Sequence, residues 1–415
     1  MSLSITGAST LIPISGQGAV RGSDLFEQPV LDAAGVACEG DRIVSVGDGA
    51  DAEVVVDASG CTVVPGFVDP HTHLPFYGWR ADEDGARLSG VRYETIHAGE
   101  GGIFRSERLL AEASDRDVLG FAESLTREML RRGTTTFETK SGYGLSVEAE
   151  LRQLRLARAL DALVPQTVVS TCLAAHAVPK GKSEGEWIGE AAEELLPKAA
   201  AEGLITACDI YVETIAFALE HAARLATACE SLGLAMRCHA DQLADNQTAA
   251  FAARWGFRSA DHLNHTSLDA VGDMATGDTA AVLLPGATFT LRQSKKPPAR
   301  DLVQAGAIVA LGTDFNPGTS PVHSMPFVIS LACRVYGLRP MEALVAATAN
   351  AAYVLGLSGE VGRIAPGYRA DMVVLECPSF DDVTYRPDHD FVLAVVCGGE
   401  LVYLAPGAES RVKRA

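Results

Sequence analysis

The 415-residue sequence contains no long uninterrupted run of apolar residues, although 47% of its residues are hydrophobic. A helix that spans a bilayer needs about 18 or more such residues in a row, so we expect no membrane association. The first residues also lack a basic segment followed by an apolar core, which is the pattern of a secretion signal. These two absences predict a cytoplasmic protein.

Cysteine-pair motifs and basic clusters are missing as well. The nine cysteines are scattered without any Cys-x-x-Cys, and an odd number argues against a disulfide framework. The sequence has 34 Lys and Arg residues and 53 Asp and Glu residues, so its net charge is −19. Without a basic cluster we expect no nucleic-acid partner.

The two ends of the chain share a pattern of short apolar runs separated by polar turns. Such runs fill residues 1–62, and they return near residues 370–375 and 391–396. We therefore predict a small β-sandwich domain formed by both termini, residues 1–62 and 366–415. The remaining residues, 63–365, are long enough for one large domain.

The middle of the chain alternates strand-like apolar runs with helical stretches. The first run ends at His73, and the others cover residues 134–138, 167–174, 207–212, 235–239, 259–262, 280–285 and 308–314. Eight strand-then-helix units within about 250–300 residues predict a closed parallel (β/α)8 barrel of the α/β class. An open doubly wound sheet is the alternative, but no Gly-rich dinucleotide fingerprint follows the first run.

The stretch 63–74 contains a His-x-His pair, His71 and His73, directly after an apolar run. Residues two apart in a strand share a face, so both side chains are predicted to project together. Two imidazoles on one face provide half of a metal site, although a bare pair can also consist of unrelated surface histidines. The outcome depends on whether other ligands lie nearby.

Half of the ten histidines fall at the carboxyl ends of predicted strands. These histidines are His71, His73, His176, His239 and His262, and Asp314 closes the eighth run at the same edge. A (β/α)8 barrel carries its active site at that edge. Any one of them alone would be interpreted as a buried structural histidine, but their shared position favours a common site.

Strand order suggests a role for each residue. His71, His73, His239 and Asp314 are predicted to hold one divalent ion and to leave a position open for water. The ion would lower the pKa of that water from about 15.7 toward about 7, and Asp314 would take its proton. His262 would polarise the electrophile or donate to the oxyanion. The fourth run has no lysine to bridge a second ion, and the ligand set suits zinc or iron.

Residues 65–73, together with His239, His262 and Asp314, resemble the amidohydrolase superfamily of the mononuclear type. Further motifs resemble the imidazolonepropionase family: residues 140–145, 174–179, 239–242, 259–263, 284–289 and 313–321. That family hydrolyses 4-imidazolone-5-propanoate to N-formimino-L-glutamate in histidine degradation, and the resemblance also implies a homodimer. Two alternatives are another hydrolase of the superfamily, such as a deaminase or a formimino-glutamate iminohydrolase, and a non-catalytic barrel.

The resemblance also implies which residues bind this small anionic substrate. Arg80 would hold the propanoate carboxylate, for which a planar guanidinium is suited. The remaining positions are Tyr93, Tyr143 and His176 at the ring, with His176 also catalytic, and Asn316, Gly318 and Thr319 at the far end. The family often has Glu where this chain has Gln242, and an amide can form hydrogen bonds but cannot act as a base.

Overall fold

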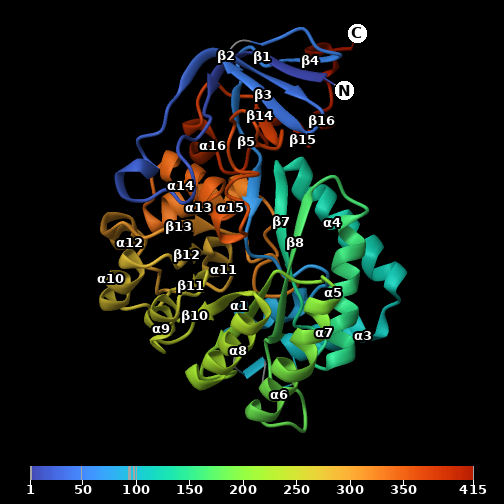
Figure 1. Ribbon diagram of the computed structural model, residues 1–415, viewed down its shortest axis with the longest axis vertical. Coiled ribbons are helices and arrows are strands. Elements are labelled where there is room, and N and C mark those ends of the chain that lie inside the picture. Colours follow the sequence, from blue (N-terminus) through green and yellow to red (C-terminus); the bar gives the residue numbers. More distant parts are fainter. Residues whose placement is uncertain (1, 48, 92–94, 97–98, 100, 415) are drawn as a thin grey trace.

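A computed structural model describes residues 2–47, 49–91, 95–96, 99 and 101–414 (Figure 1). The barrel occupies the lower part of the view, and a second sheet lies above it beside both ends of the chain. Across the described residues, every helix is either too short or too polar to cross a bilayer.

Eight parallel strands of the described chain form one sheet in which each strand pairs with the next along the sequence. They are β6 (Phe67–Asp69), β7 (Thr134–Lys140), β8 (Thr167–Ala175), β9 (Ala207–Val212), β10 (Ala235–Ala240), β11 (Ser259–His262), β12 (Ala280–Leu283) and β13 (Val309–Leu311). A parallel bridge between Thr72 and Phe315 joins the ends that follow β6 and β13. The predicted (β/α)8 barrel is confirmed.

Helices surround this sheet (Figure 1). They are α1 (Ala81–Leu88), α3 (Ile103–Glu112), α4 (Asp115–Arg131), α5 (Val147–Asp161), α6 (Glu184–Glu190), α7 (Leu196–Ala201), α8 (Leu219–Leu232), α9 (Thr248–Trp255), α10 (Leu268–Thr276), α11 (Pro285–Thr290), α12 (Ala299–Ala305), α13 (Met325–Tyr336), α14 (Pro340–Ala346), α15 (Ala349–Val354) and α16 (Asp381–Tyr385). Ser114 and Ser146 begin α4 and α5, because each hydroxyl accepts a backbone N–H of the first turn.

The second sheet combines strands from the two ends of the chain. They are β1 (Ser2–Leu11), β2 (Leu31–Glu39), β3 (Arg42–Gly47), β4 (Val54–Asp57), β5 (Thr62–Pro65), β14 (Met372–Leu375), β15 (Val392–Cys397), β16 (Glu400–Leu404) and β17 (Val412–Arg414). Its order is β16-β15-β14-β5-β1-β2-β3, while β4 pairs with both β1 and β17. This sheet has its own buried apolar cluster, so a separate β unit from both termini is confirmed. The residue limits of the two predicted domains stay a prediction.

The run that leads to His71 differs from its prediction as a single strand. It is divided into β5, which belongs to the terminal sheet, and β6, which begins the barrel and ends at Asp69. Gly66 lies between them, and a Cβ atom there would stand 2.1 Å from Thr135 Oγ1. A side chain at this crossing between the two sheets would therefore require Thr135 to move. His71 and His73 consequently follow the strand and are not part of it.

Candidate active site

His71 and His73 are fixed by backbone contacts with the segment that follows β13. Asp314 N donates to His71 O over 2.9 Å, and His73 N donates to Phe315 O over 2.9 Å. The buried Asp69 carboxylate accepts both the amide and the hydroxyl of Thr313, at 3.0 and 2.6 Å. These contacts hold the first and last strands in a register that brings Asp314 against both histidines.

Five ligand-type side chains converge at the carboxyl end of the barrel, and we call them the His/Asp cluster: His71, His73, His239, His262 and Asp314. Within the described residues they form two overlapping groups. His71 groups with His73 and Asp314, and also with His239 and His262, and within each group the possible ligand atoms lie within 4.8 Å of one another. Asp314 Oδ1 lies 3.1 Å from His73 Nε2 and 3.5 Å from His71 Nε2.

The unsatisfied nitrogens of this cluster fit a metal ion. His71 Nε2 and His239 Nε2 are buried and have no hydrogen-bond partner in the part of the chain that the structure describes, which is costly unless something else binds them. The opposite ring nitrogens are held by carboxylates: His71 Nδ1 lies 2.6 Å from Asp261 Oδ2, and His239 Nδ1 lies 3.1 Å from Asp209 Oδ1. A carboxylate behind an imidazole that points into a cavity is the usual arrangement of a metal-ligating histidine.

The protonation states agree with this arrangement. Burial lowers the pKa of His71 and His73, and it lowers the pKa of His262 to about 3, so these imidazoles are neutral at pH 7. Burial alone would raise the pKa of Asp314. The hydrogen bond with His73 and the nearby histidines lower this pKa by more than burial raises it, so the pKa lies below its usual value. Neutral imidazoles and an ionised carboxylate are the forms that bind a cation.

Beneath the His/Asp cluster lies a buried network of charges that sequence reasoning missed. Lys140 Nζ contacts Asp209 Oδ2 at 2.6 Å and Glu138 Oε2 at 2.8 Å. Arg237 pairs with Glu138 and, at 2.8 Å, with Asp261. A signal was present, because all of these charged residues except Lys140 lie within predicted barrel strands, and a charge inside a barrel needs a partner.

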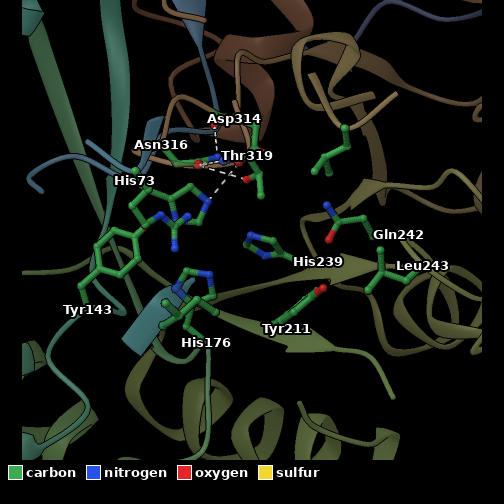
Figure 2. Close-up of a pocket in the computed structure, with 13 residues that line it drawn as sticks. His73, Tyr143, His176, Tyr211, His239, Gln242, Leu243, Asp314, Asn316 and Thr319 are labelled. Carbon is green, nitrogen blue, oxygen red and sulfur yellow. Dashed lines mark hydrogen bonds and ion pairs between the residues drawn. The ribbon is translucent and has the colours of Figure 1, made fainter. Parts of the chain in front are cut away.

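A pocket of about 40 Å³ opens beside the cluster (Figure 2). Figure 2 shows His73, His176 and His239 near its centre, with Tyr143 on one side and Gln242 and Leu243 on the other. Its lining residues are His73, Arg80, Ile103, Tyr143, His176, Tyr211, His239, Gln242, Leu243, Leu291, Asp314, Asn316 and Thr319.

Most of the predicted site residues therefore meet in one place. The structure places Gly318 against Arg80, at the edge of the pocket. Tyr93 lies outside the described residues. Four lining residues were not predicted: Ile103, Tyr211, Leu243 and Leu291. Ile103, Leu243 and Leu291 carry no chemical signal in the sequence that distinguishes them from core residues.

Arg80 is a buried cation whose ion pair with Glu83 is a long one. It is 2% exposed, and its Nε and Nη1 atoms have no hydrogen-bond partner among the described residues. The nearest recorded carboxylate, that of Glu83, lies 3.7 Å from Nε, and both Glu83 oxygens accept the amide of Gly102. A guanidinium in this state is suited to bind the carboxylate of a ligand.

The loop that carries Tyr143 is fixed by one buried carboxylate. Glu150 accepts hydrogen bonds from the amides of Gly142, Gly144 and Leu145, at 2.7–2.9 Å. The His176 ring stacks on His73, with 5.0 Å between the ring centroids. Tyr143 and His176 are therefore held next to the His/Asp cluster.

The loop after β13 is organised by Asn316. Its Oδ1 accepts from the amides of Gly318 and Thr319, at 2.9 and 2.7 Å, and from the Thr319 hydroxyl at 3.0 Å. Its Nδ2 donates to Asp314 O over 2.6 Å. The Asn316 side chain therefore fixes the backbone of the loop from Asp314 to Thr319.

A family model described as "Amidohydrolase family" matches residues 62–402. The chain belongs to the amidohydrolase family and is a hydrolase that acts on C–N bonds. The imidazolonepropionase of Rubrobacter xylanophilus is 46% identical over 403 residues, which cover 94% of this chain and 96% of that protein. The imidazolonepropionase of Symbiobacterium thermophilum is 40% identical and covers 97% of both chains. Within the amidohydrolases, the chain is a member of the imidazolonepropionase family.

Solved structures agree on the architecture. A zinc-bound adenosine deaminase from Xanthomonas campestris has a TM-score of 0.73 at 20% identity, over 97% of this chain and 93% of that one. A triazine hydrolase variant has a TM-score of 0.75 at 16% identity, over 97% and 95%. At these identities the likeness concerns the fold alone.

Proposed function

We propose that the protein hydrolyses 4-imidazolone-5-propanoate to N-formimino-L-glutamate. The observation that carries this proposal is the buried guanidinium of Arg80, which lies in the same pocket as His73, His239 and Asp314 and has two nitrogens without a hydrogen-bond partner among the described residues. One end of the pocket can thus hold a carboxylate while the other holds a hydrolytic centre. The imidazolonepropionases among the relatives support the same substrate.

We further propose that His71, His73, His239 and Asp314 hold one divalent ion, zinc or iron. The amidohydrolase family is metal-dependent, and the orphaned imidazole nitrogens and the carboxylates behind them support this ligand set. When bound, such an ion acts as a Lewis acid and makes water a stronger acid near neutral pH. Zinc and iron both suit imidazole and carboxylate ligands, so metal analysis has to distinguish them.

The chain's own residues then divide the work of hydrolysis. The Asp314 carboxylate takes the proton of the attacking water, and the ring C–N bond breaks as the leaving nitrogen gains a proton. His262 polarises the electrophilic carbon–oxygen bond, since its neutral ring lies in the same cluster. Tyr143 and His176 position the ring of the substrate, and His176 lies near enough to the cluster to assist proton transfer.

The remaining predicted residues complete the binding site. Arg80 would bind the propanoate, Gln242 would contribute hydrogen bonds only, and the role of Tyr93 at the ring stays a prediction from the resemblance. Asn316 and Thr319, which line the pocket, and Gly318, which lies against Arg80, would hold the far end of the substrate. We also retain three proposals from the sequence: a homodimer, a cytoplasmic location, and no nucleic-acid partner.

The test is turnover of imidazolone propanoate, followed as loss of the imidazolone absorbance together with an assay for free ammonia. Opening of the ring consumes one water and releases no ammonia, because both ring nitrogens stay in the formimino product. A deaminase or a formimino-glutamate iminohydrolase would release ammonia instead. Absorbance loss without ammonia supports the proposal. Ammonia release, or no turnover by the metal-loaded protein, contradicts it.

A further inference from the structure

Arg87 is a second buried guanidinium near the pocket, and nothing in the proposed function uses it. It lies in the last turn of α1, and its side chain is 9% exposed. Its Nη2 atom donates to Gly318 O over 2.8 Å and to Asp84 Oδ1 over 2.8 Å, whereas Nε and Nη1 have no partner among the described residues. Arg87 therefore forms an ion pair with Asp84 on its own helix and, with the same nitrogen, a hydrogen bond to the loop after β13.

Gly318 lies between two guanidinium groups. A Cβ atom built on it would lie 1.9 Å from Arg80 Nη2 and 2.3 Å from Arg80 Cζ, so the Arg80 guanidinium rests directly on the Gly318 backbone. Arg87 holds the carbonyl of the same residue, and Asn316 holds its amide. The Arg80 guanidinium thus packs on the Gly318 peptide, and the hydrogen bond from Arg87 fixes the carbonyl of that peptide.

The position of the Gly318 peptide also limits how the Arg80 side chain can move. Arg80 N donates to Pro317 O over 3.0 Å, so the start of α1 and the Gly318 loop are joined at a second point. Glu83 lies 3.7 Å from Arg80 Nε, just beyond hydrogen-bond distance. Arg80 and Glu83 thus form an ion pair without a hydrogen bond. If the Gly318 loop moved, Arg80 could turn toward Glu83 and form that hydrogen bond, and the guanidinium would then be less available to a ligand.

We propose that Arg87 is a positioning residue that fixes the Gly318 peptide, keeps Arg80 free to bind a carboxylate, and so contributes to selection of carboxylate-bearing substrates. This inference rests on the proposed function, since it concerns the carboxylate subsite of that substrate. It assigns Arg87 no contact with the reacting atoms.

The experiment compares Arg87→Met, Arg87→Lys and Arg152→Met with wild type. Methionine keeps much of the apolar volume of the arginine stem, and lysine keeps the charge but loses the planar fork. Arg152 is the matched control, because it also joins a carboxylate, Asp115, to backbone carbonyls but makes no recorded contact with the pocket. Each variant is assayed on imidazolone propanoate and on an imidazolone that lacks the carboxylate.

For Arg87→Met we expect KM for the propanoate to rise about 10- to 100-fold with kcat within about threefold of wild type, as for loss of a binding contact. The carboxylate-free substrate should change by less than about threefold, Arg87→Lys should fall between wild type and Arg87→Met, and Arg152→Met should change both substrates equally. Equal losses on both substrates for Arg87→Met, or no loss on either, would overturn the inference.

Calorimetric titration supplies a second readout that does not depend on turnover. The probes are 3-(imidazol-4-yl)propanoate and 4-ethylimidazole, which differ by the carboxylate. The affinity ratio of the two probes should shrink in Arg87→Met, or in Arg87→Lys if the methionine variant does not fold, and an unchanged ratio rejects the inference. If wild type fails to hydrolyse the propanoate, the proposed function fails, while the titration still decides the role of Arg87.

Discussion

Replacement of Gly318 by alanine tests whether Arg80 lies where the structure places it. The added Cβ would stand 1.9 Å from Arg80 Nη2 and 2.3 Å from both Nε and Cζ. These separations are far below van der Waals contact, so the guanidinium must leave its position or the loop must move. The backbone of Gly318 is not in the left-handed conformation, so alanine causes no backbone strain there. The effect of Gly318→Ala therefore comes from the clash of the new methyl group with Arg80.

The magnitude follows from two separate costs. Overpacking of a buried site costs about 1–3 kcal/mol of folding free energy. Loss of a buried guanidinium–carboxylate contact costs about 2–4 kcal/mol of transition-state binding. At about 1.4 kcal/mol for each factor of ten, the second cost corresponds to a loss of about 30- to 700-fold in kcat/KM for imidazolone propanoate.

The assay measures kcat/KM for the propanoate and for the carboxylate-free imidazolone, with thermal unfolding of the same samples. Gly120→Ala is the matched control, because Gly120 lies in α4 and a Cβ there meets no atom within 4 Å. Alanine within a helix should stabilise the protein by about 0.5–1 kcal/mol, and activity should not change. If Gly318→Ala keeps kcat/KM for the propanoate within twofold of wild type, Arg80 does not bind the substrate from the position described.

Three further outcomes concern the metal centre. Elemental analysis of the purified protein should give one divalent ion per chain, and two ions, or full activity after complete chelation, would refute the proposed ligand set. Asp314→Asn should lower kcat about 10²- to 10⁴-fold, because an amide cannot accept the proton of water, and turnover within a few-fold of wild type at equal metal content would exclude Asp314 as the base. Asp261→Asn should weaken metal affinity about 10- to 100-fold, measured by competition with a chelator, because His71 Nδ1 loses its anionic partner. An unchanged affinity would show that Asp261 serves the buried charge network only.

The sequence predicted correctly those site residues that lie at the ends of barrel strands. His239 and His262 lie at the ends of β10 and β11, so the strand pattern alone was enough to bring them together. It was less informative about the first barrel strand, because the division at Gly66 depends on Thr135, a residue far along the chain. Periodicity detects an apolar run, but it does not show which of two sheets the run joins.

Contacts between distant loops could not be predicted from the sequence. Arg87 and Gly318 are separated by 231 positions, and neither lies in an element whose pattern refers to the other. An arginine in a polar helix is normally solvated, so no pattern in the sequence indicates that this one is buried. Such pairs are set by the packing of α1 against the loop after β13, which is a property of the whole fold.

The joining of β5 to β14 has a consequence for how this protein folds as it is synthesised. Val64 pairs with Val373, so β5, which already pairs with β1, gains its second partner only when most of the chain has left the ribosome. A nascent chain that ends near residue 365 already carries every barrel strand, yet it leaves an edge of β5 unpaired. Unpaired strand edges promote association with other chains, and pairings this distant in sequence form slowly. We therefore expect the chain after residue 365 to cover an edge of β5 that would otherwise promote association, although none of its described residues lines the pocket.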